Sequence, residues 1–168
     1  LGDSDKVGVR ALAEVAGLRG PADAYDVGFR LGPRLNAAGR LGDALRALEL
    51  LLSPDPARCA ELARQLDEAN RDRQQIESDI LAEALAGVER TFDPERDFGL
   101  VAAGAGWHPG VIGIVASRLV QRYGRPAICI ALGGEGGRGS CRSIEGFDMA
   151  GQLQACHALL RKHGGHAM

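Results

Sequence analysis

The segment around which the chain is organised is Gly32-Pro33-Arg34-Leu35-Asn36-Ala37-Ala38-Gly39-Arg40-Leu41-Gly42. Its opening glycine and proline are expected to end whatever element precedes them. Arg34 and Arg40 each present a planar set of N–H donors that suits a phosphate or a carboxylate, and Asn36 lies between them with an amide. The alternative is a solvated polar loop, since runs of one charge sign are often exposed faces.

The surroundings of this segment are basic, although the chain as a whole is not. Residues 30–46 hold four arginines and one aspartate, a local charge of +3, whereas the whole chain carries −2. Because the net charge gives no global sign of nucleic-acid binding, any such binding must come from local patches. Two further stretches, residues 136–144 and 149–168, contain basic residues and no acidic residue.

Composition is that of an ordinary soluble globular protein. The 168 residues are 45% hydrophobic and 25% charged, enough for one domain or two small ones. A signal peptide and a long apolar run are both lacking, which predicts a cytoplasmic protein without membrane contact. The four cysteines are too widely spaced to indicate a zinc site or a disulfide framework, and Cys129 is expected in the core.

Four stretches in order resemble motifs of the RecJ-like single-stranded-DNA-specific exonucleases, members of the DHH phosphoesterase family. They are residues 29–41, 106–118, 139–143 and 164–168, and the resemblance is loosest between residues 53 and 95. It implies that the chain is a piece of a longer protein. Residues 1–53 would be the helical end of the DHH catalytic core, residues 54–92 a connecting helix, and residues 93–168 a DHH-associated nucleic-acid-binding domain truncated at its C-terminus.

The apolar patterning predicts an α/β chain whose first part is helical. We expect helices over residues 6–16 and from Asp43 to Leu52, with a short helical or turn segment over residues 21–29. A helix over residues 56–90 would be roughly 50 Å long. Its middle, residues 67–75, is polar nearly all round and is therefore expected to stay in solvent, bridging two bodies; a coiled-coil seam is the alternative.

The pattern of apolar residues in the second part of the chain predicts a small mixed α/β domain. Buried strands are expected over residues 99–103 and 127–132, with a helix over residues 109–123 crossing between them, so these strands should be parallel. A glycine-rich turn over residues 133–137 should form a hairpin into a strand over residues 138–143, which would then be antiparallel to the strand of residues 127–132. A final helix, capped by Asp148, is expected from Met149 to about Lys162.

The candidate phosphate-binding residues of this domain follow from the resemblance. It implies that Ser140, Arg142 and Ser143 hold a nucleic-acid backbone or its 5′ end, while Cys141 has no role. It also implies that His166 faces the active-site cleft opposite Arg34, Asn36 and Arg40. From the residues alone, residues 139–143 could equally be a solvated strand end, and His166 a surface histidine.

Trp107 and His108 precede a predicted helix and are weaker candidates. A helix N-terminus favours anions, and an indole can stack on a base. The structural alternative is that Trp107 packs, Pro109 starts the helix, and Gly113 allows close contact with the sheet. The sequence favours this structural alternative for Trp107 and leaves His108 undecided.

The resemblance implies 5′-to-3′ hydrolysis of single-stranded DNA in DNA repair and recombination, with Mn²⁺ or Mg²⁺ in the intact enzyme. The Asp-His-His motif that would help to hold these ions is absent from the sequence, so we expect the chain to bind no metal and to be inactive alone. Nuclease turnover by the purified chain with added Mn²⁺ would contradict this. The alternatives are another DHH phosphoesterase, acting on short oligoribonucleotides or nucleoside bisphosphates, and a non-catalytic nucleic-acid-binding module.

Overall fold

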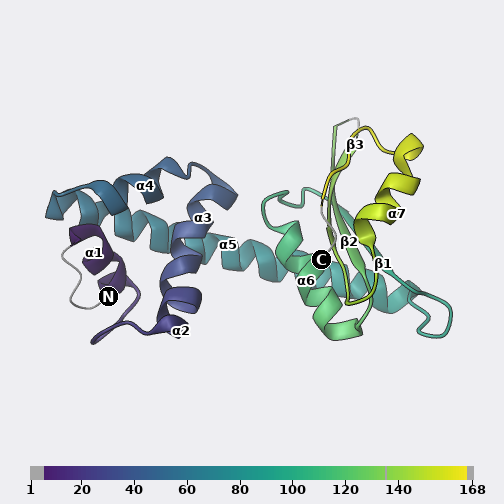
Figure 1. The fold of residues 1–168 in the computed structure, drawn as a ribbon, viewed down its shortest axis with the longest axis horizontal. Helices are drawn as coiled ribbons and strands as arrows, with labels where there is room; N and C mark the ends of the chain where they lie inside the picture. The colour runs from purple at the N-terminus through teal and green to yellow at the C-terminus, as the bar shows by residue number, and fades with distance from the viewer. Residues whose placement is uncertain (1–5, 135, 166–168) are drawn as a thin grey trace. The chain divides into compact units, whose positions relative to one another are not determined.

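The computed structural model describes residues 6–134 and 136–165, which fall into two compact units. The first unit runs from Leu1 to Gln75 and the second from Ile76 to Met168. The boundary lies inside one helix, α5 (Pro56–Thr91), which contributes its first part to one unit and its second part to the other (Figure 1). Each unit has its own set of buried apolar residues.

The first unit is entirely helical. It contains α1 (Val7–Val15), α2 (Ala24–Asp26), the π-helical turn η1 (Val27–Leu31), α3 (Gly32–Leu41), α4 (Leu45–Leu52) and the first part of α5. Each main helix turns one apolar stripe inward, and the fully buried leucines come from three of them: Leu12, Leu50, Leu62 and Leu66. The helices predicted over residues 6–16 and 43–52 are confirmed with slightly shorter bounds.

The arginine segment is a helix, and the prediction that Gly32 and Pro33 end the preceding element is wrong. The backbone passes from η1 directly into α3, because the N–H of Gly32 donates to the carbonyl of Val27, five residues back. A β-carbon at Gly32 would lie 2.9 Å from that carbonyl oxygen, so a glycine fits the wide turn. Pro33 lies in the first turn of α3, directly after this wide turn.

Helix α5 confirms the long helix predicted over residues 56–90, and Asp55 accepts a hydrogen bond from the backbone N–H of Ala57 at its start (2.9 Å). The expectation that its polar middle stays in solvent is wrong at two positions. Asp67 is 7% exposed and Asn70 is 4% exposed. Both are tolerated there because arginine side chains hydrogen-bond to their oxygens, which offsets the cost of burial.

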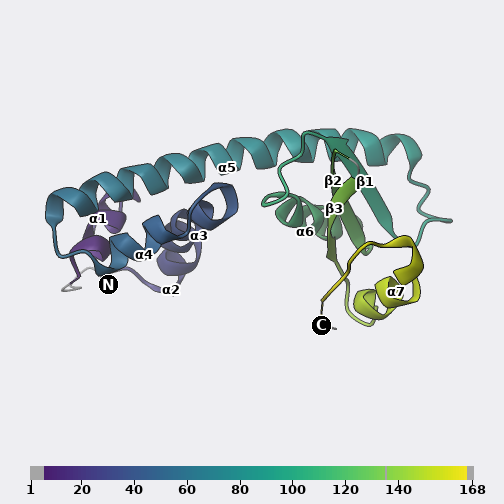
Figure 2. The ribbon, with the colours of Figure 1, turned by 90° about the horizontal axis from the view of Figure 1, so that it is seen from above.

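The second unit is built on a three-stranded sheet in the order β1 (Leu100–Ala105), β2 (Ala127–Gly133), β3 (Gly136–Arg142). Strands β1 and β2 are parallel, joined through α6 (Ile112–Tyr123), and β3 is antiparallel to β2, as predicted. Helices α6 and α7 (Met149–Ala155) lie on opposite sides of the sheet (Figures 1 and 2). The predicted mixed α/β fold class is confirmed.

The strands bury one face more fully than the other, which differs from the uniform burial predicted for them. Ala102 and Cys129 are buried, whereas Val101 on the other face of β1 is 66% exposed. Burial raises the pKa of the Cys129 thiol to about 12, as expected for the predicted core residue. Apolar residues of α5 and α6 also belong to this core: Ile80, Ala84, Val88, Ile112, Val115 and Leu119.

Two helix ends differ from their predicted positions. Helix α6 begins at Ile112 rather than at Pro109, because the carbonyl of His108 first forms a turn by accepting from the backbone N–H groups of residues 111 and 112. Helix α7 ends at Ala155 rather than near residue 162, and a 3₁₀ turn, η2 (His157–Leu159), follows it. No residue of α7 is buried, so packing does not extend it. Asp148 caps α7 as predicted, accepting from the N–H of Gly151 (2.9 Å).

No helix within residues 6–134 and 136–165 combines the length and the apolar character that a membrane span requires.

Candidate nucleic-acid interface

Helix α3 places the three predicted ligand residues of its segment on two different sides. Residues four apart share a side of a helix, so Asn36 and Arg40 point the same way, and neither is buried. Arg34 instead lies on the side of buried Ala38. The structure therefore brings together Asn36 and Arg40 but not Arg34.

Arg34 takes part in a nearly buried ion pair between two helices. Its Nε donates to Oδ1 of Asp67 on α5 (2.8 Å), and its Nη1 donates to the carbonyl of Arg30 (2.6 Å). The two paired side chains are 17% and 9% exposed. The other carboxylate oxygen of Asp67 accepts from Arg71. Because the guanidinium is bonded and largely covered, this geometry favours a structural role for Arg34 over direct contact with a ligand.

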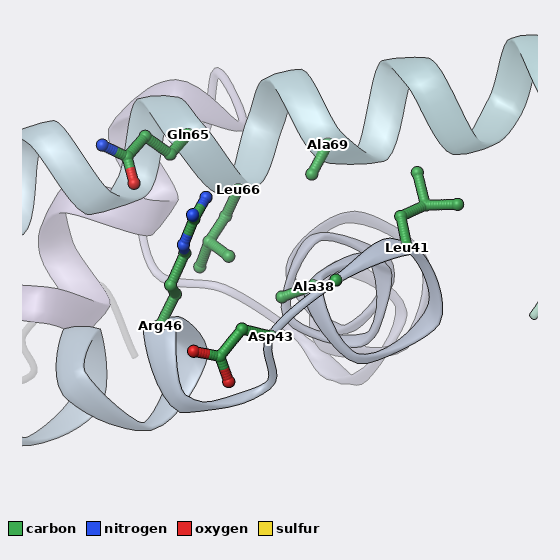
Figure 3. Close-up of a pocket in the computed structure, with 8 residues that line it drawn as sticks. Ala38, Leu41, Asp43, Arg46, Gln65, Leu66 and Ala69 are labelled. Carbon is green, nitrogen blue, oxygen red and sulfur yellow. The ribbon is translucent and has the colours of Figure 1, made fainter.

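A small pocket lies within the first unit beside α3, with a volume of about 250 Å³ (Figure 3). Leu66 and Ala69 of α5 and Ala38 of α3 contribute an apolar lining, while Asp43 and Arg46 reach it from the start of α4. One acidic and one basic side chain on its rim leave no excess of positive charge there. The pocket therefore does not by itself select a phosphate.

The end of β3 carries the second predicted group. Side chains two apart on a strand share a face, so Ser140 and Arg142 lie together on the face that meets α6. Nη1 of Arg142 donates to Oγ of Ser140 (3.3 Å) and to the carbonyl of Cys141 (2.7 Å). Among the described residues, the N–H groups of Nε and Nη2 have no acceptor and can donate to a ligand. Arg142 is exposed and, within the described part of the chain, forms no ion pair with a carboxylate.

Arg138 shares this face of β3; the sequence predicted it only as part of the basic stretch of residues 136–144 and not as a ligand residue. It pairs with Ala131 of β2, as Ser140 pairs with Cys129 and Arg142 with Ala127. Its side chain is exposed. The spacing of residues 138, 140 and 142 was a sufficient signal, because alternate residues of a strand line one face.

Ser143 does not take part in this face. The hydroxyl of Ser143 donates within the turn that leads to α7, to the carbonyls of Phe147 (2.5 Å) and Ile144 (3.2 Å). The Ser143 hydroxyl, which was predicted to contact a phosphate, therefore already has hydrogen-bond acceptors within the fold. His166 lies outside the described residues.

The Trp107 and His108 side chains are engaged within the second unit. Trp107 is 6% exposed, its Nε1 donates to Glu83 of α5 (2.7 Å), and its ring covers Gly104. This burial supports the structural interpretation of the indole. Nδ1 of His108 accepts from the N–H of Gly110 (3.1 Å), so the neutral ring carries its proton on Nε2. His108 thus stabilises the turn before α6.

No three histidine, cysteine, aspartate or glutamate side chains gather into a metal-binding group within residues 6–134 and 136–165. The described side chains thus do not fit a two-metal hydrolytic centre, which needs clustered carboxylates and imidazoles. What this chain offers on the described residues is a set of donors for phosphate.

The small mixed sheet with its basic strand end is the part of the chain that matches a known domain family. Residues 97–168 match the family model described as the DHHA1 domain. The match includes β1, α6, β2, β3 and α7, and therefore the Ser140–Arg142 face. Over these residues the second unit is similar to DHHA1 domains.

The whole chain is similar to single-stranded-DNA-specific exonucleases named RecJ. It is 42% identical to that of Bacillus subtilis over 168 residues, 98% of this chain and 21% of the relative. It is 46% identical to that of Dickeya dadantii over 171 residues, 96% of this chain and 29% of the relative. The predicted resemblance is confirmed: the chain is RecJ-like along nearly its entire length, and it spans less than a third of these relatives.

Solved structures agree with this similarity. The crystal structure of RecJ from Thermus thermophilus in complex with Mg²⁺ matches with a TM-score of 0.86 and 38% identity, over 99% of this chain and 25% of that one. The corresponding complex with Mn²⁺ matches with a TM-score of 0.84 at the same identity, over 99% of this chain and 24% of that one. The fold of the present chain is therefore that of the equivalent segment of RecJ.

Proposed function

We propose that this chain is the nucleic-acid-binding part of a RecJ-like exonuclease that degrades single-stranded DNA from its 5′ end. The intact protein would hydrolyse phosphodiesters with Mn²⁺ or Mg²⁺ held by residues outside this chain, in DNA repair and recombination, in the cytoplasm. The similarity to exonucleases named RecJ supports the reaction and the substrate class. The chain alone, without a metal-binding group on its described residues, would bind DNA and not cleave it.

The observation that carries this proposal is the exposed guanidinium of Arg142 beside the hydroxyl of Ser140. The N–H groups of Nε and Nη2 form one edge of the guanidinium, and this edge suits two oxygens of a single phosphate. Ser140 adds a hydroxyl, and the nearby first turn of α6 adds the positive end of a helix dipole. A 5′-terminal phosphate carries more negative charge than an internal phosphodiester, so such a site would favour it.

The remaining predicted residues have separate roles in this proposal. Asn36 and Arg40, on one side of α3, would contact the backbone of the DNA, and His166 would contribute from the C-terminal motif. Arg34 would act indirectly, because its ion pair with Asp67 fixes α3 against α5. We assign no ligand contact to Trp107 or Ser143, since their polar atoms have partners in the fold, nor to His108, whose Nδ1 accepts from Gly110.

The test is fluorescence anisotropy of the chain with short single-stranded oligonucleotides that end in a 5′ phosphate or a 5′ hydroxyl. The unmodified chain should prefer the phosphate about tenfold, because a hydrogen-bonded charge pair contributes on the order of 1.5–3 kcal/mol. Arg142→Ala should abolish this preference. Arg122→Ala is the matched control: it removes one exposed arginine of α6, paired with Glu89, from the same unit. Equal loss with both variants, or no preference in the unmodified chain, would contradict the proposal.

A further inference from the structure

Gly113 occupies the first turn of α6 and faces the basic end of β3. A β-carbon added there would lie 2.8 Å from Oγ of Ser140 and 2.9 Å from Nη2 of Arg142. Both distances are below those of ordinary van der Waals contact, which begin at 3.4 Å. The missing side chain of Gly113 therefore leaves the space in which the polar ends of Ser140 and Arg142 lie.

The backbone gives no other reason for a glycine at this position. Gly113 is not among the described glycines with positive φ, so an L-residue could adopt its conformation. Within a helix, glycine is less favourable than alanine by roughly 1 kcal/mol. Gly113 lowers helix stability and is not required by the backbone conformation. The space that it leaves for the side chains of Ser140 and Arg142 explains its presence.

The neighbours of Gly113 differ from those of the packing glycines. A β-carbon at Gly8 would overlap the backbone carbonyl of Leu50, and one at Gly104 would overlap the indole ring of Trp107. Those neighbours cannot move without disturbing the core. At Gly113 the neighbours are the ends of two flexible side chains, so an added methyl group would displace them and leave the fold in place. The displaced atoms include Nη2, on the guanidinium edge that is open to a phosphate.

We propose that Gly113 is a positioning residue that holds Ser140 and Arg142 in the arrangement that recognises a 5′-terminal phosphate. This inference rests on the proposed function, because it assumes that these two side chains bind the phosphate. It adds a residue on the facing helix whose contribution is the absence of a side chain. Gly113 would determine the preference for a phosphate end, while general attraction to DNA would come from the charges around it.

The experiment compares Gly113→Ala with Gly87→Ala, using 5′-phosphorylated and 5′-hydroxyl single-stranded oligonucleotides and thermal melting. Gly87 lies in α5, and a β-carbon there would meet no atom within 4 Å, so it controls for the general effect of glycine to alanine in a helix. Gly113→Ala should keep or raise the Tm and reduce the phosphate preference at least about fivefold. Gly87→Ala should leave the preference unchanged. A Gly113→Ala variant that keeps the preference, or one whose Tm falls steeply, overturns the inference.

Failure of the inference is distinguishable from failure of the proposed function. If Arg142→Ala removes the phosphate preference and Gly113→Ala retains it, the phosphate site stands and the role of Gly113 does not. If the unmodified chain shows no preference, the proposed function fails and this inference fails with it. Gly113→Ser, which adds a hydroxyl in the same space, should lower the preference as Gly113→Ala does, and a preference retained by the serine variant would also count against the inference.

Discussion

Arg34 in the helical unit and Arg142 in the sheet unit differ in burial and in hydrogen-bond partners, although both are arginines of predicted phosphate-binding motifs. Arg34 is bonded to a buried carboxylate and is 17% exposed. Arg142 is exposed and hydrogen-bonds only to a hydroxyl and a carbonyl within the described part of the chain. In sequence, both are basic residues in glycine-containing motifs that suit a phosphate. The two differ in their partners in the fold. The positive charge of Arg34 is offset by the buried carboxylate of Asp67, which weakens its attraction for a ligand.

This difference predicts that the two sites respond to mutation in different ways. Loss of the Arg34 pair should appear as lost stability of the helical unit, with DNA binding affected only through the fold. Loss of Arg142 should appear as lost phosphate recognition with stability nearly unchanged, as is usual for an exposed side chain. The following changes test that division from the larger effect to the smaller.

The largest effect is expected for Asp67→Ala. The change would leave the largely covered guanidinium of Arg34 without its carboxylate, which should lower the free energy of unfolding by about 3 kcal/mol. Urea unfolding followed by far-ultraviolet circular dichroism measures it. Arg34→Ala should cost less, because Arg71 still donates to Asp67.

Glu49→Ala is the matched control for that experiment. Glu49 also forms an ion pair within the first unit, with Arg58 (2.6 Å), but both side chains are well exposed. Its removal should leave the urea midpoint nearly unchanged, since exposed ion pairs contribute little. Similar midpoints for Asp67→Ala and Glu49→Ala would show that the Arg34 pair is no more structural than a surface pair.

A smaller effect is expected for Arg138→Ala. Because Arg138 lies on the same face of β3 as Arg142 but farther along the strand, it should contact a backbone phosphate without recognising the 5′ end. Affinity for 5′-phosphate and 5′-hydroxyl oligonucleotides should fall equally, by about twofold to threefold, and the dependence of log Kd on log salt should decrease by about one unit. A selective loss for the phosphorylated end would instead place Arg138 in the end-binding site.

Much of the fold could be predicted from the sequence because the apolar patterns are local. The helix of residues 56–91, both parallel strands and the hairpin into β3 follow from periodicity and glycine positions. The helical state of the arginine segment could not be predicted in this way. Its opening glycine and proline usually end elements, and only the π-helical turn of residues 27–31 reconciles them with a continuous helix.

The candidate site was predicted from residue type and from the resemblance, whereas the contacts that bear on Arg34 and Trp107 are long-range. Arg34 and Asp67 are 33 residues apart, and Trp107 and Glu83 are 24 apart, so no local pattern reveals that these polar groups have partners. The burial of Asp67 was missed for the same reason, since a polar stretch predicts exposure unless its partners are known. Arg138 was different, because its alternation with Ser140 and Arg142 was visible in the sequence.

The most direct test of the central claim is a titration of the ¹⁵N-labelled chain with a 5′-phosphorylated single-stranded oligonucleotide, observing the arginine Nε–H signals by NMR. Arg→Lys variants at positions 34 and 142 would assign the two signals. The account predicts that the Arg142 signal shifts on binding and that the Arg34 signal, held by Asp67, does not. A shift of the Arg34 signal with no change at Arg142 would contradict it.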